Sequence, residues 1–254
     1  MDYFVDKSSV VRRIWGNSDT ILFIFAGSAA EFALNKAVDW LYFTGRLPAD
    51  PLGRLFSTVA YARLIVFSDR VGAYRAIDNM ATIHAKVESN RGAAIPDWAY
   101  RDVLFMLIDY SIRAYELLER KLTLSEKIEV CQVFLQVGQR MGLVGLPTTY
   151  QDWLVMREQH LEQDLQYSHY TKDLYQQYKK HLGLFRFILL KQAQQLLVSE
   201  KVNKLLGLGK TAYMKPIVIA YKLSRKLKLD GLLKNSILPA SYKAEIKSLD
   251  KIPA

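Results

Sequence analysis

Three residues have the types and the spacing that could support chemistry on a bound group: Arg54, Thr58 and His84. Arg54 and Thr58 are an i, i+4 pair, so on a helix they share one face about one turn apart. His84 follows later, at helical spacing from the apolar residues Met80 and Val87, which places it on the core-facing stripe of a predicted helix. A histidine there is either a packed residue or a ligand directed at something bound.

His84 has no second predicted metal ligand beside it, and this restricts the kind of cofactor that it could hold. A single imidazole cannot retain a bare zinc ion, because such sites use three or four protein ligands. It can hold haem iron, because the porphyrin supplies the other four nitrogens. The alternative stays open, since Arg54 and Thr58 are equally typical of an arginine at the core edge and a threonine bonded to its own backbone.

The other polar candidates have weaker support. His160, His169 and His181 lie in polar, charged stretches, and we expect them on the surface. Three aspartates could serve in acid–base chemistry, although their spacing is equally that of ordinary helix positions: Asp97, Asp102 and Asp109. The chain has no GxGxxG, P-loop, GxSxG or HExxH motif, so nucleotide-binding, hydrolase and zinc-protease functions lack support.

The elements that must position these residues are predicted to be helices, because apolar residues recur at helical spacing and no clear run alternates as in a strand. We expect a first long helix over residues 21–43, capped at residues 17–19 and ended by Gly45. A second should run from Pro51 to Phe67 with Asp50 as its cap. A third, capped by Ser68 or Asp69, should carry His84.

Further helix starts are marked by capping residues. Asp97 can cap a long helix, and Thr123 with Glu126 forms the capping-box pattern of a helix that should reach about Met141. Thr148 or Thr149 should begin the next one. The predicted fold is all-α: a single multi-helix bundle over residues 1–170 that encloses a cofactor pocket, with a basic amphipathic helical extension over residues 171–254 packed on it.

Composition is that of an ordered globular chain, with 254 residues of which 50% are hydrophobic. The single Cys131 excludes an internal disulfide and a CxxC motif, which fits a reducing compartment. No run reaches the ~18 apolar residues of a transmembrane helix. The apolar run 21–30 after Arg12 and Arg13 is interpreted as a domain helix, not an export signal, because acidic residues flank it.

Charge is distributed unevenly along the chain. Residues 1–170 hold 18 Lys and Arg against 20 Asp and Glu, whereas residues 171–254 hold 17 against 5. Lysines interleaved with leucines in the second part indicate an anionic membrane surface as partner, and no nucleic acid is expected. A solvated basic face with its leucines in the core is equally compatible. We expect a cytoplasmic protein that associates peripherally with membranes.

One family shares the segments that carry these residues. The stretch from Phe43 to Thr58, which contains Asp50-Pro51-Leu52-Gly53-Arg54, and the later Ile83-His84-Ala85-Lys86-Val87 resemble the oxygenase domain shared by latex-clearing rubber oxygenases and MpaB-type oxygenases. Residues 109–120, 140–150 and 236–239 are similar to that family as well. The likeness covers most of the chain, but only the Arg/Thr/His part is specific enough to bear chemistry.

The resemblance implies an all-α fold around haem b, with His84 as the iron ligand and Arg54 and Thr58 as catalytic and haem-pocket residues. It also implies oxidation of an apolar, often isoprenoid, compound by O₂. Ser57, which would also lie at the cofactor, stands where the rubber oxygenases carry a lysine able to occupy the far side of the iron. Because serine is too short for that role, we expect an iron that is five-coordinate or water-ligated.

The leading hypothesis is a haem-dependent oxygenase that acts with O₂ on a small hydrophobic, isoprenoid or lipid-like substrate. Two rivals remain. One is a haem-binding sensor or carrier without turnover, and the other is a peripheral lipid-binding helical protein that lacks the cofactor.

Overall fold

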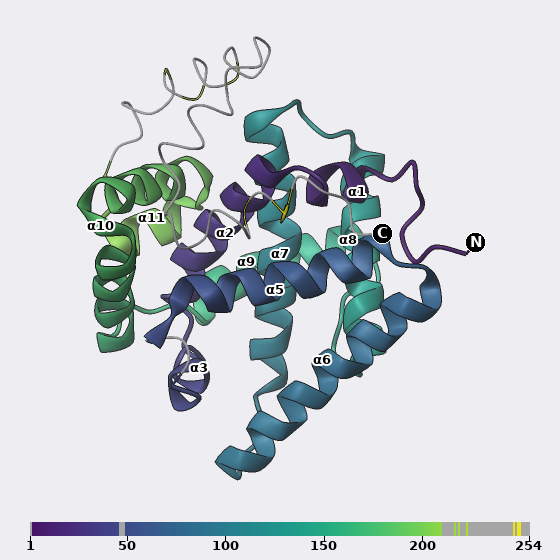
Figure 1. Ribbon diagram of the computed structural model, residues 1–254, viewed down its shortest axis with the longest axis horizontal. Helices are drawn as coiled ribbons and strands as arrows, with labels where there is room; N and C mark the ends of the chain where they lie inside the picture. The colour runs from purple at the N-terminus through teal and green to yellow at the C-terminus, as the bar shows by residue number, and fades with distance from the viewer. Residues whose placement is uncertain are drawn as a thin grey trace.

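The computed structural model describes residues 2–45 and 49–209, together with a few isolated positions between 216 and 249. Over these residues the chain is helical and its only strand-like features are two isolated bridges, which confirms the predicted all-α class. In chain order the helices in Figure 1 are α1 (Val10–Trp15), α2 (Ser18–Phe32), α3 (Asp39–Phe43), α5 (Pro51–Phe67), α6 (Arg70–Arg91), α7 (Asp97–Leu118), α8 (Leu124–Arg140), α9 (Tyr150–Gln163), α10 (His169–Leu197) and α11 (Glu200–Leu206).

Most predicted helix starts are confirmed by the side chains that cap them. Asp50 accepts a hydrogen bond from the backbone N–H of Gly53, and Asp69 accepts one from Gly72. Capping boxes begin α8 at Thr123 and α9 at Thr149. Each satisfies backbone N–H groups that the first turn leaves free, so these starts are fixed locally. At α7 the prediction was off by one residue, because Pro96 is the cap and Asp97 is the first helical residue.

The single helix expected over residues 21–43 is wrong, because the chain leaves helical geometry between α2 and α3. Asn35 accounts for the break. Its side-chain oxygen accepts a hydrogen bond from the backbone N–H of Ala37, and its backbone forms a bridge with Leu165. Both interactions compete with the helical hydrogen-bond ladder.

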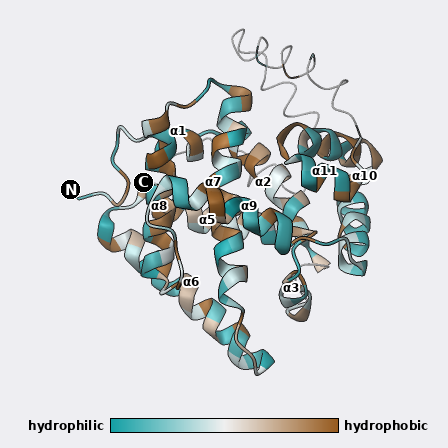
Figure 2. Ribbon diagram, turned by 180° about the vertical axis from the view of Figure 1, so that it is seen from behind, coloured by the Kyte–Doolittle hydropathy of each residue, from teal (hydrophilic) through white to brown (hydrophobic). Residues whose placement is uncertain are grey.

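The bundle is organised around α2 and α7, which pack along each other; α10 packs on α2, and α5 packs on α6. The largest core cluster draws on α1, α2, α5, α6, α7 and α8. In Figure 2 the hydrophobic colour is concentrated in the middle of the bundle, near the labels α1, α5 and α7, whereas α6 is largely hydrophilic. The run that follows Arg12 and Arg13 lies within α2, whose Ile21 and Ile24 are fully buried. It is therefore a domain helix, as predicted.

The C-terminal third begins as part of the packed structure. Thr171, Leu174 and Tyr178 of α10 are buried, and α10 bends at Gly183, which has a φ of 74°. Most of the predicted basic extension beyond residue 209 lies outside the described residues. Lys222 is described, and its ammonium donates to the carbonyls of Leu117 and Glu119. Among the described helices, none combines the length and hydropathy that crossing a bilayer requires.

Candidate functional site

A cavity of about 320 Å³ lies inside the bundle, between α2, α3, α5, α6, α7 and α8. Its walls are mainly apolar and include Phe25, Phe32, Ile65 and Leu107. Among the few polar groups on the wall are Arg54, Thr58 and His84. Cofactor sites span roughly 300–1,000 Å³ and combine apolar walls with a few polar groups, so this cavity has the character of a cofactor or ligand site.

His84 lies on the cavity wall, and the hydrogen bond that it makes fixes its tautomer. Its Nδ1 lies 2.8 Å from the carbonyl oxygen of Met80, one helical turn earlier. A carbonyl can only accept, so Nδ1 carries the proton and Nε2 of the neutral ring keeps its lone pair. Within the described part of the chain, Nε2 has no hydrogen-bond partner. The imidazole is therefore in the state that metal ligation requires.

The surroundings of His84 favour the neutral ring. Burial lowers the pKa of His84, and the positive charge of Arg54 lowers it further, whereas the Met80 carbonyl and Glu88 act in the opposite direction. The ring of Tyr100 packs edge-on against the imidazole, with centroids 5.4 Å apart. The Tyr100 hydroxyl donates to a carboxylate oxygen of Glu88 at 3.2 Å, so the aromatic neighbour is itself held in place.

Arg54 and Thr58 share a face of α5, as their spacing predicts. Nη1 of Arg54 donates to the hydroxyl of Thr58 at 3.3 Å, and that hydroxyl lies 3.2 Å from the backbone carbonyl of Arg54. The expected threonine-to-backbone bond is thus present, but both residues also line the cavity. A cation and a hydroxyl are therefore placed on the same wall as the imidazole.

Ser57 has a different position from the other three sequence candidates. Its side chain is exposed and does not line the cavity. The hydroxyl donates to the backbone carbonyl of Arg54 at 2.7 Å and accepts from Nη1 of Arg54 at 3.2 Å. The structure therefore brings Arg54, Thr58 and His84 together at the cavity and leaves Ser57 on the outer side of α5.

The prediction that His160 is a surface residue is wrong, because only 3% of it is exposed. Its Nε2 lies 2.9 Å from a carboxylate oxygen of Glu31, and its Nδ1 lies 2.6 Å from one of Asp102. Burial would lower the pKa of His160, but these two carboxylates raise it to about 9. A signal was available, because Trp153, Arg157 and His160 recur at helical spacing and form one buried face of α9.

A buried ion-pair network surrounds this histidine. Arg157 donates through Nη2 to Glu31 at 2.7 Å and to Asp109 at 2.9 Å, and the hydroxyl of Tyr110 donates to Glu31 at 2.8 Å. Burial alone would raise the pKa of Glu31, but the guanidinium of Arg157 holds it well below its usual range. Asp102 and Asp109 are therefore buried network members, whereas Asp97 and His169 are exposed and His181 is half-buried.

Within the described residues, an all-helical bundle encloses an apolar cavity with a cation, a hydroxyl and an imidazole on its wall, an arrangement suited to ligand binding. The chain matches the model of one family over residues 12–215, described as the ER-bound oxygenase mpaB/B′/rubber oxygenase catalytic domain. That match covers most of the chain, so this protein belongs to the family of oxygenase catalytic domains. No curated protein and no solved structure matched the chain.

Proposed function

We propose that this protein is a haem b-dependent oxygenase and that His84 is the axial ligand of the iron. The observation that carries the proposal is the ring of His84, which lies on an apolar cavity wall with its Nδ1 hydrogen-bonded to the Met80 carbonyl, while its Nε2 has no hydrogen-bond partner within the described residues. A metal-bound histidine commonly donates its other N–H to a carbonyl or carboxylate. When bound, haem supplies an iron centre that can bind and activate O₂.

The residues around the cavity fit that cofactor. The guanidinium of Arg54 places positive charge at the wall, which suits the two propionate carboxylates of haem b. The hydroxyl of Thr58 holds that guanidinium at 3.3 Å, so Thr58 positions the charge. The carbonyl of Met80 sets the orientation of the imidazole and keeps the proton off Nε2.

The substrate that these walls favour is hydrophobic and isoprenoid or lipid-like. Nearly all of the wall is hydrocarbon or aromatic, with residues such as Phe25, Ile65, Leu107 and Phe134. Transfer of an apolar molecule from water to such a wall is favourable in proportion to the area buried. Charged substrates would lose their hydration without gaining enough polar partners.

We also propose that the protein contacts an anionic membrane surface peripherally, from the cytoplasm. After the bend at Gly183, α10 exposes Leu184, Phe185 and Ile188, with exposed fractions of 61%, 65% and 49%. The same part of the chain carries 17 Lys and Arg against 5 Asp and Glu over residues 171–254. Exposed apolar side chains within a basic segment suit an interfacial helix.

The deciding experiment is absorption spectroscopy of the full chain expressed with ample haem. We expect a Soret band in the wild type and its loss in His84→Ala, while His169→Ala, which removes an exposed histidine, should retain it. A colourless wild type, or a band unaffected by His84→Ala, would rule out the proposed ligand.

A Soret band without O₂ consumption on any apolar compound would favour the sensor or carrier, and a colourless protein that sediments with anionic vesicles would favour the lipid-binding rival.

A further inference from the structure

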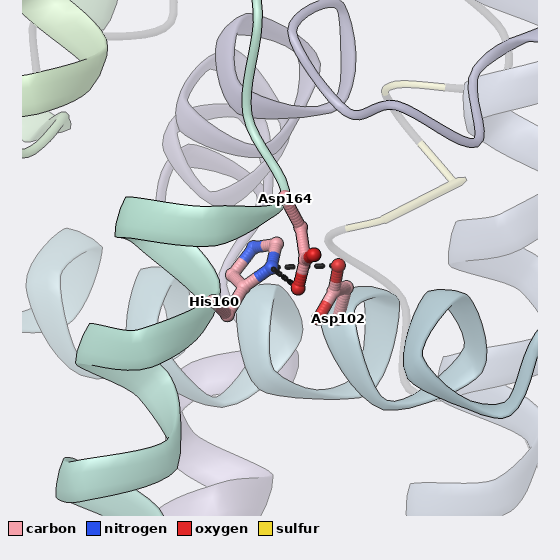
Figure 3. A group of neighbouring side chains, drawn as sticks. All are labelled: Asp102, His160 and Asp164. Carbon is pink, nitrogen blue, oxygen red and sulfur yellow. Dashed lines mark ion pairs between the residues drawn. The ribbon is translucent and has the colours of Figure 1, made fainter.

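A second group of potential ligands lies outside the wall of the cavity, where α9 ends against α7. His160 and Asp164 are one turn apart at the C-terminal end of α9, and Asp102 faces them from α7 (Figure 3). Nδ1 of His160 lies 2.6 Å from Oδ2 of Asp102 and 3.6 Å from Oδ2 of Asp164. Ligand atoms bound at about 2.1 Å to one ion are about 3.0–3.4 Å apart, so the two observed separations bracket that range.

Nδ1 of His160 is the atom whose surroundings need an explanation. The side chain is 2% exposed, and Nδ1 has no hydrogen-bond partner despite its short distance to Asp102, because the pair lacks hydrogen-bond geometry. The other ring nitrogen, Nε2, lies 2.9 Å from Glu31 and can donate its proton there. The carboxylate oxygens that face Nδ1 favour a positive species at this atom, either a second ring proton or a metal ion, and a metal ion takes the place of that proton when it binds.

The residues that hydrogen-bond to His160 and Asp102 are of the kind that orient metal ligands. Metal-bound histidines characteristically donate their second N–H to a carboxylate, and Glu31 occupies that position for His160. Ligating carboxylates are in turn held by hydrogen bonds, and Nδ2 of Asn35 donates to Oδ2 of Asp102 at 3.1 Å. Both supports come from α2 and the segment that follows it, so the cluster joins three parts of the chain.

Charge compensation divides the buried network into two halves. Glu31 and Asp109 are paired with Arg157, and Asp109 is also paired with Arg113. Within the described residues, neither Asp102 nor Asp164 forms an ion pair with an arginine or lysine. The positive charge beside these two carboxylates must therefore come from the imidazolium of His160 or from a bound cation.

We propose that Asp102, His160 and Asp164 bind a divalent transition-metal ion. The donors are one imidazole nitrogen and two carboxylate oxygens, a set that zinc accepts with water in the remaining position. The side chain of Asp164 is 24% exposed, which gives that position a route to solvent. The ion would join α7 to the end of α9. This site is separate from the proposed haem site and does not depend on it.

The test uses the full chain, purified without metal-affinity chromatography and stripped with a chelator. The stripped protein is titrated with Zn²⁺ against a chromogenic competitor, and its thermal midpoint is recorded with and without the ion. We expect one bound equivalent and a rise in the midpoint. Asp164→Asn should weaken Zn²⁺ binding by at least about ten-fold, since even an outer partner of a ligand contributes 10- to 100-fold.

The matched control is Glu158→Gln, which removes an exposed carboxylate from the same helix and should leave Zn²⁺ binding unchanged. Circular dichroism establishes that each variant is folded. Crystals soaked in zinc supply a readout that needs no variant, since the anomalous signal should peak between the three side chains. A wild type that binds no Zn²⁺, equal binding by Asp164→Asn, or an anomalous peak only elsewhere would each overturn the site, whatever the haem content proves to be.

Discussion

The Nδ1–H of His84 donates to the carbonyl of Met80 at 2.8 Å, and the ring that it orients lines the interior cavity. An ordinary core histidine would be expected to satisfy both nitrogens, because unsatisfied buried polar atoms are costly. Here one nitrogen is satisfied by the helix itself, while the other has no hydrogen bond within the described residues. That asymmetry is the one that the proposed ligand role requires.

The ligand role of His84 can be tested by chemical rescue. His84→Gly should lose the Soret band, and added imidazole should restore it, because the free base can enter the space left by the side chain and supply the same nitrogen. The measurement is a titration of the variant with imidazole in the presence of haem. If imidazole restores nothing although circular dichroism shows an intact fold, direct ligation by His84 is contradicted.

Thr58 and Ser57 should differ in their effects although they are adjacent in sequence. Thr58→Val keeps the side-chain volume but removes the hydroxyl that holds Arg54 at the cavity wall. One such hydrogen bond contributes about 0.5–1.5 kcal/mol, so haem affinity should fall about two- to ten-fold.

Ser57→Ala is the matched control, because Ser57 is exposed and lies off the cavity wall. Haem affinity measured by titration should change less in this variant than in Thr58→Val. The reverse order would mean that Ser57, as the family resemblance first implied, is the residue at the cofactor.

Local signals account for what could be predicted of the fold. The caps at Asp50, Asp69, Thr123 and Thr149 act on backbone groups within three residues, so the sequence window around each contains the whole interaction. The break at Asn35 was missed because its apolar neighbours continue a helical pattern. The interactions that hold it include a bridge to Leu165, far along the chain.

The candidate sites likewise include residues that a local pattern predicts and residues whose environment depends on distant parts of the chain. The shared face of Arg54 and Thr58 follows from spacing along one helix, and it was predicted. The burial of His160 depends on Glu31 and Asp102, which belong to two other helices. Polar neighbours in sequence indicated a surface residue, whereas the polar neighbours in space are the reason that this histidine can be buried.

The buried pair of Arg157 and Glu31 should be strongly coupled. Arg157→Met leaves the carboxylate of Glu31 buried without its cation, and the free energy of unfolding should fall by about 3–5 kcal/mol. The double variant with Glu31→Gln should recover part of that loss, since no uncompensated charge remains. Urea denaturation measures both.

Arg140→Met serves as the reference for an exposed pair, because Arg140 bonds Asp78 where both side chains are about half exposed. The free energy of unfolding of Arg140→Met should fall by no more than about 1 kcal/mol. Similar losses for Arg157→Met and Arg140→Met would contradict a special contribution from the buried network.

The capping box of α8 should make part of the stability depend on pH. The hydrogen bond from Arg120, together with those from Thr123, lowers the pKa of Glu126 from 4.5 to about 2. A carboxylate with a lowered folded pKa stabilises the fold fully above its unfolded pKa, and loses that effect as pH falls from 4.5 through 2.

Glu126→Gln isolates that charge, because glutamine can still complete a capping box. At pH 7 the variant should be less stable by up to about 1 kcal/mol, and the difference from wild type should shrink on acidification towards pH 2. Denaturation curves at several pH values measure it. A difference that stays constant between pH 7 and pH 2 would show that the charge of Glu126 is not the cause.

The exposed end of α10 should determine association with membranes. Phe185→Ser removes an aromatic side chain that is 65% exposed, and sedimentation with anionic phospholipid vesicles should fall, because burial of apolar area drives insertion at the interface. Val155→Ser is the matched control, since Val155 is 60% exposed and belongs to a different helix, α9. Added salt should weaken binding of the wild type by screening the basic residues, while the contribution of Phe185 should persist. Equal sedimentation of the two variants, or binding unaffected by salt and by Phe185→Ser alike, would exclude α10 as the membrane-contacting surface.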